Sequence, residues 1–207
     1  MKPTKGLENV PAQGPFIIAC KHVGSMVDGI FVGAVIIPKI DQKIHFISLV
    51  AEWGRFWKQN VAEQWAGVIP YLEEDPRVCL DKGLDLLKQG KVVGIFPEGI
   101  LKNNQNNNGS RIKTGVARLA ILSQLPILPI GLDYQINDKD GLKNMQNYWH
   151  VMWQTIFNPQ SVQVIIGQPF EISEYYSKEF NREMLFEASN YIMTKIEKIS
   201  KVTINNH

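Results

Sequence analysis

Short apolar segments alternate with longer segments of helical periodicity, and this alternation constrains the fold more than any other feature of the chain. Segments typical of buried strands span residues 16–20, 45–50, 68–71, 92–96, 127–132 and 162–166. Segments with the apolar spacing of helices span residues 25–37, 52–65, 75–88, 113–123 and 181–200. The alternation predicts an α/β fold: a mainly parallel (mixed) sheet flanked by helices.

Length and local signals refine this prediction. A chain of 207 residues that is 44% hydrophobic can bury one substantial core, so we expect a single domain over residues 1–207. The helix at 75–88 is the best marked, because Asp75 can cap it, Pro76 suits its first turn and Gly90 suits a left-handed stop. Apolar residues of the last helix form one stripe that predicts a core-facing side: Met184, Ala188, Tyr191, Ile192, Ile196 and Ile199.

Charge and cysteine usage argue against several classes of protein. The net charge is +2, from 22 basic and 20 acidic residues, so nucleic-acid binding is not favoured. Cys20 and Cys79 lie in apolar surroundings without metal-type spacing, and we predict no metal and a reducing, cytoplasmic setting. No apolar run in the sequence approaches the roughly 18–20 residues needed to span a bilayer. We therefore predict no transmembrane helix, and contact with a membrane from one side only.

Polar residues follow the first apolar segment at the position where open α/β sheets place reactive side chains. His22 can act as a general base, and Asp28 can fix its tautomer. Two other interpretations stay open: His22 as a hydrogen-bonded loop residue, and Ser25 to Asp28 as a helix capping box. Cys20 falls on the same face as His22 if the strand continues, but a buried apolar cysteine explains it better than a nucleophile.

A second polar turn, Pro97-Glu98-Gly99, follows the apolar segment 92–96. At a strand end, the Glu98 carboxylate can be aimed at an acceptor hydroxyl or at a backbone donor that shapes a site. The alternative is a carboxylate that only stabilises the turn.

These turns belong to an ordered set of short motifs. The others are Gly6 to Pro11, Ala66 to Pro70, Lys113-Thr114-Gly115, Pro126 to Ile130 and Gly167-Gln168-Pro169. Taken together and in this order, they make nearly the whole chain resemble the 1-acylglycerol-3-phosphate acyltransferase (lysophosphatidate acyltransferase) family of glycerolipid acyltransferases. Each motif alone is weak, and the order makes the resemblance specific.

The resemblance implies an O-acyltransferase of phospholipid synthesis. A fatty acyl group would pass from acyl-coenzyme A or acyl-carrier protein, as co-substrate, to the free sn-2 hydroxyl of lysophosphatidate, giving phosphatidate. His22 would be the general base, Asp28 its partner, and Pro97, Glu98 and Gly99 would bind substrate. No cofactor is expected. The implied setting is peripheral or monotopic, at the cytoplasmic face of a membrane.

The chain departs from the family pattern at two places. Five residues separate His22 from Asp28, where the family has four, and the loop before Ser25 can absorb the extra residue because Gly24 tolerates unusual backbone angles. The two family arginines that hold the acceptor phosphate are replaced by Tyr71-Leu72 and Ile100-Leu101.

Three nearby cations could supply an anionic site in place of those arginines: Lys102, Arg111 and Lys113. They could equally solvate a polar loop. A changed acceptor, such as another lysolipid or amphipathic molecule, is therefore an alternative, as are a thioesterase-like hydrolase and a catalytically silent lipid-binding protein.

The segment 52–65 is the candidate for membrane contact. One helical face carries Trp53, Phe56, Trp57, Val61 and Trp65, with Arg55 and Lys58 beside it. This pattern is typical of a helix that lies in a headgroup layer, and it fits a core-facing stripe equally well.

Overall fold

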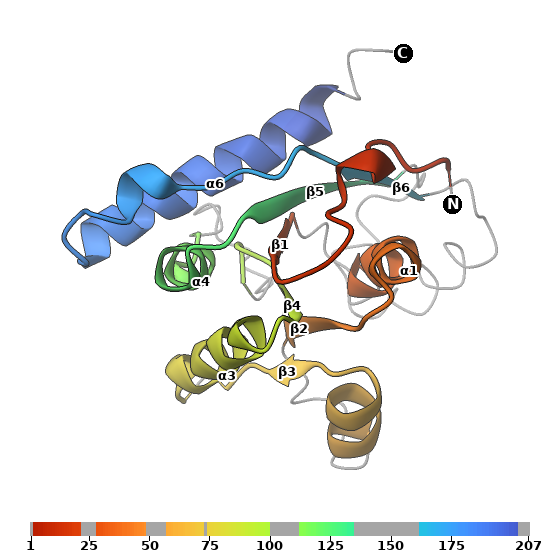
Figure 1. Cartoon of the computed structure of the whole chain (residues 1–207), viewed down its shortest axis with the longest axis horizontal. Helices are drawn as coiled ribbons and strands as arrows, with labels where there is room; N and C mark the ends of the chain where they lie inside the picture. Colours follow the sequence, from red (N-terminus) through yellow and green to blue (C-terminus); the bar gives the residue numbers. More distant parts are fainter. Residues whose placement is uncertain are drawn as a thin grey trace, which may run out of the picture.

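The computed structural model describes residues 2–21, 28–48, 57–72, 74–99, 112–134 and 162–202. Within these ranges the centre of the protein is a six-stranded sheet of strand order β3-β2-β4-β1-β5-β6 (Figure 1). The strands are β1 (Ile17–Cys20), β2 (Ile44–Ser48), β3 (Ile69–Pro70), β4 (Val92–Ile95), β5 (Ile127–Tyr134) and β6 (Val162–Ile166).

The sheet is mixed, as the sequence predicted. β1 pairs in parallel with β4 on one side and with β5 on the other. β2 is parallel to β4 and to β3, whereas β6 runs antiparallel to β5. Because five of these six strands are parallel, their carboxyl ends meet at one edge of the sheet, which is where ligand sites of open α/β sheets form.

Helices cover both faces of the sheet. The long ones are α1 (Asp28–Ile40), α3 (Pro76–Lys88), α4 (Gly115–Ser123) and α6 (Arg182–Val202). Shorter turns are the 3-10 helices η1 (Leu7–Asn9) and η6 (Ser173–Tyr175), and a π-helix, η3, spans Trp57–Trp65. Figure 1 shows α1 on one side of the sheet and α3 and α4 on the other.

Alternate residues of β1 point into two separate core layers. Ile18 and Cys20 are buried in the layer that contains α1. Ile17 and Ala19 are buried in the layer formed with α3, α4 and α6. A strand buried on both faces reads as a continuous apolar run, which explains why β1 carries no polar residue.

Several element ends differ from the predictions, and the structure gives a physical reason for three of them. The helix predicted to end at Ile37 continues through Pro38 to Ile40, since the buried Ile40 side chain draws the last turn onto the core. The helix predicted from Lys113 begins at Gly115, because the Lys113 amide donates instead to the Pro97 carbonyl, at 2.8 Å. β5 extends past Leu132 to Tyr134, where it still pairs with β6.

The predicted helix signals at α3 are confirmed. The Asp75 side chain accepts a hydrogen bond from the Arg77 amide at 3.1 Å, and Pro76 is the first helical residue. Gly90 follows the helix with a φ of 79°. This left-handed conformation suits a residue without a Cβ, so the chain turns there into β4.

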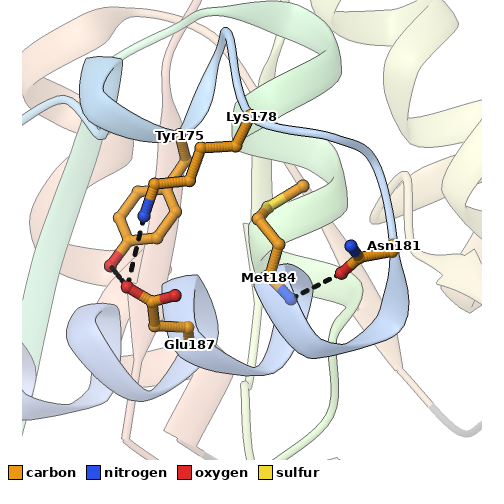
Figure 2. Close-up of polar contacts among 5 residues, drawn as sticks. All are labelled: Tyr175, Lys178, Asn181, Met184 and Glu187. Atoms are coloured by element: carbon orange, nitrogen blue, oxygen red, sulfur yellow. Dashed lines mark hydrogen bonds and ion pairs between the residues drawn. The ribbon is translucent and has the colours of Figure 1, made fainter.

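The last helix, α6, packs along the apolar stripe that the sequence predicted, with Met184, Ala188, Ile192 and Ile196 buried. Asn181 caps its start by accepting from the Met184 amide at 2.9 Å (Figure 2).

The Glu187 side chain ties α6 to the preceding turn. Its Oε1 accepts from the Tyr175 hydroxyl and from the Lys178 ammonium, each at 3.3 Å (Figure 2). These contacts link η6 and the residues after it to the first half of α6.

Candidate active site

The ends of two neighbouring parallel strands and the start of α1 form the candidate site. β1 ends at Cys20 and β4 at Ile95, and the strands are hydrogen-bonded neighbours. The turn Pro97-Glu98-Gly99 therefore lies at the same edge of the sheet as the residues that follow Cys20. Asp28 is the first residue of α1 and has no exposed surface.

The pKa of the Cys20 thiol is sensitive to the charged groups that lie near the end of β1. Burial raises its pKa well above the usual value, and the negative charges of Asp28 and Glu98 raise it further. Both carboxylates therefore lie close enough to the end of β1 for their charges to act on the thiol. A thiol kept neutral is a poor nucleophile, which favours the interpretation of Cys20 as a packing residue.

The Pro-Glu-Gly turn is closed by backbone hydrogen bonds. The Gly99 amide donates to the Phe96 carbonyl at 3.0 Å, and the Lys113 amide donates to the Pro97 carbonyl at 2.8 Å. Gly99 has a φ of 69°, in the left-handed region that favours glycine. The turn thereby holds Glu98 at the sheet edge and joins the segment that precedes α4.

The Lys113 side chain lies directly against this turn. A Cβ at Gly99 would approach Lys113 Cγ to 3.0 Å and Cε to 3.4 Å, so the lysine stem crosses the glycine. Lys113 is exposed, which leaves a cation at the surface beside Glu98-Gly99. Of the predicted site residues, the structure thus brings Lys113 against Gly99, and it places Asp28 and Glu98 near the end of β1.

Phe46 is a site-supporting residue that sequence reasoning missed. It lies opposite Gly94 in the sheet, and a Cβ at Gly94 would come within 2.3 Å of the Phe46 ring. The ring stacks on Phe96 with centroids 5.7 Å apart, and its Cδ2 lies 3.7 Å from a Cβ built at Gly29. Phe46 therefore bridges β4 and the residue after Asp28. The sequence signal that could have revealed this contact is Gly94, a glycine within an apolar strand.

Comparison with known proteins gives the family. The family described as Acyltransferase matches residues 4–133, which include Asp28, the Pro97-Glu98-Gly99 turn and Lys113. The chain belongs to the acyltransferase family. It is an O-acyltransferase of the α/β class, as its sequence predicted.

Two curated relatives have more specific names. The chain is 26% identical over 169 residues to a 1-acyl-sn-glycerol-3-phosphate acyltransferase of Bacillus subtilis, covering 81% of this chain and 73% of that protein. It is 29% identical over 136 residues to the chloroplastic 1-acyl-sn-glycerol-3-phosphate acyltransferase BAT2 of Brassica napus, covering 62% and 36%. A crystal structure of the Thermotoga maritima acyltransferase PlsC aligns with 95% of this chain and 71% of its own, at 17% identity and a TM-score of 0.46.

Several predicted residues of this acyltransferase lie outside the described ranges. These are His22, Lys102 and Arg111, and their roles stay predictions. The candidate membrane helix is described from Trp57 to Trp65, where Ala62 is buried and Trp65 is 74% exposed. Among the helices that the structure describes, none combines the length and apolar character needed to cross a membrane.

Proposed function

We propose that this acyltransferase transfers a fatty acyl group from an acyl thioester to the sn-2 hydroxyl of 1-acylglycerol-3-phosphate, giving phosphatidate. The donor would be acyl-coenzyme A or acyl-carrier protein. The similarity to the Bacillus subtilis enzyme, which extends over 81% of this chain, carries the proposal. The arrangement of Asp28 and Glu98 around the end of β1 supports it, because both carboxylates flank the position from which His22 follows.

The chemistry needs one general base. His22, in its neutral form, would take the proton of the acceptor hydroxyl as the oxygen attacks the thioester carbonyl carbon. The C–S bond then breaks, the thiolate leaves, and the proton passes from the imidazolium to the sulfur. Asp28, buried at the start of α1, would hold the imidazole in the correct tautomer. No covalent enzyme intermediate is required.

The phosphate of the acceptor needs a cation. Lys113 meets this need in the described part of the chain, since its side chain crosses Gly99 and stays exposed. A lysine ammonium binds phosphate as a point charge, without the two-pronged fit of an arginine. Lys102 and Arg111 would contribute to the same anionic site.

A different lysolipid acceptor is the second candidate, and one observation favours it. The position after Pro70, where the family has an arginine, is Tyr71, which packs against the core layer of α3 and α4. The Tyr71 amide donates to the Ser48 carbonyl at 2.8 Å, so the backbone here continues the pairing of β3 with β2. Leu72, the next residue, is partly exposed and apolar. Neither residue offers a charge to a phosphate.

The test measures thiol release from acyl-coenzyme A by the wild type and by His22→Ala, with and without lysophosphatidate, and identifies the lipid product by mass. Phosphatidate formed by the wild type alone is the expected result. The same assay with lysophosphatidylglycerol and lysophosphatidylcholine tests the second candidate.

Thiol release without any acceptor would show a thioesterase-like hydrolase instead. Turnover absent with every acceptor, and with acyl-carrier protein as donor, would contradict the proposed function. Circular dichroism of His22→Ala is the control that the variant remains folded.

A further inference from the structure

Between Gly29 and Pro38, helix α1 is apolar on all sides, although the structure buries only its inner side. Facing outward are Ile30, which is 65% exposed, Ala34, and Ile37, which is 41% exposed. Their spacing of four and three residues places them in one row, here called the outer stripe. A helix that is hydrophobic all round is normally covered on all sides, so the outer stripe indicates a covering partner.

The opposite side of the protein has the composition of a surface in water. The exposed positions of α3 and α6 are mostly charged: Arg77, Asp81, Lys82, Asp85, Lys88, Arg182, Glu183, Glu187 and Lys198. Val78 of α3 and Leu122 of α4 are also exposed on that side, at 48% and 56%. Figure 1 shows α1 across the sheet from α3 and α4, so the two faces of the protein meet different surroundings.

The position of the outer stripe connects it with the candidate site. α1 begins at Asp28, and Ile30 follows two residues later. Whatever covers the stripe therefore lies next to the residues that would accept the lysolipid. At the other end of the stripe, Lys39 and Lys43 are exposed, with the exposed Asp41 between them. An apolar helix face flanked by lysines is typical of helices that lie in a layer of anionic headgroups.

We propose that the outer stripe of α1 binds a lipid surface with anionic headgroups and holds the active-site end of α1 at that surface. This inference rests on the proposed function, which explains why such a contact would exist. The acceptor is a lipid that resides in membranes. Trp65 of η3 supports a lipid partner, because it is 74% exposed and tryptophan is enriched at membrane interfaces. In Figure 1, η3, the golden helix at the lower right, lies on the same side of the sheet as α1.

The experiment measures binding to vesicles of phosphatidylcholine with and without phosphatidylglycerol, by co-flotation. The test variant is Ile30→Gln/Ile37→Gln, which removes apolar surface without adding charge. The matched control is Val78→Gln/Leu122→Gln, which changes two exposed apolar residues on the opposite side. Activity is measured in parallel with a short-chain lysophosphatidate kept below its micelle concentration.

The test variant should bind anionic vesicles at least about tenfold more weakly than the wild type, because burial of each isoleucine contributes to lipid affinity. The control should bind like the wild type, and all three proteins should acylate the monomeric acceptor equally. Equal binding by all three would overturn the proposal, as would a wild type that stays unbound while active on the monomeric acceptor. If the wild type forms a dimer without lipid and the test variant is monomeric, a second copy of the chain covers α1 instead of lipid. Stripe-dependent binding without turnover of any acceptor would uphold the lipid contact and contradict the proposed function.

Discussion

Substitution of Gly94 by alanine should disturb both the core and the candidate site, because the Phe46 ring occupies the space of the new methyl group. A Cβ there would lie 2.3 Å from two ring carbons, well inside van der Waals contact. The ring cannot move freely, since it is 9% exposed and stacks on Phe96. Overpacking of this kind costs about 1–3 kcal/mol. For a chain of this size, that corresponds to a loss of roughly 3–9 °C in Tm.

Thermal unfolding followed by circular dichroism measures this effect, and Gly33→Ala is the matched control. A Cβ at Gly33 would meet only Ile37 Cδ1, at 3.4 Å, and alanine favours the helix, so this variant should be neutral or slightly stabilised. A Tm of Gly94→Ala equal to that of the wild type would refute the reasoning. Since the Phe46 ring also lies beside Gly29, the residue after Asp28, kcat of Gly94→Ala should fall more than KM rises. The double variant Phe46→Leu/Gly94→Ala should recover part of both losses.

Three further outcomes follow from described contacts. Asn181→Ala removes the acceptor that caps α6 and should cost about 1 kcal/mol, whereas Asn181→Asp should retain most of the stability; urea denaturation distinguishes them. The raised pKa of Cys20 keeps its thiol protonated in the folded protein. Unfolding releases that proton above the ordinary thiol pKa, so stability should fall as pH rises from about 8.5, and Cys20→Ala should show a shallower decline. The same burial predicts that a thiol reagent labels Cys20 only after unfolding; rapid labelling of native protein at Cys20 would contradict it.

The layers of the fold could be predicted because their signals are local. Strand β6 matches its prediction from Val162 to Ile166, and the α6 stripe lies in the core as its spacing indicated. The helix through Pro38 escaped prediction because the burial of Ile40 is a tertiary effect that overrides the local preference of proline.

The candidate site was predictable only as far as strand ends reveal it. Asp28 and Glu98 each follow an apolar segment, where open α/β sheets place reactive side chains, and their shared effect on Cys20 agrees with this. The contact between Phe46 and Gly94 depends on which strands are neighbours and in what register, and a single sequence does not state either.

The most direct test of the central claim is the rate of phosphatidate formation from lysophosphatidate and acyl-coenzyme A by the wild type and by Asp28→Asn. Our account predicts that the wild type forms phosphatidate and that Asp28→Asn is slower by about 10²-fold or more, with an unchanged fold by circular dichroism. An Asp28→Asn variant as fast as the wild type would contradict the account of the site, and a wild type that forms no phosphatidate would contradict the proposed reaction.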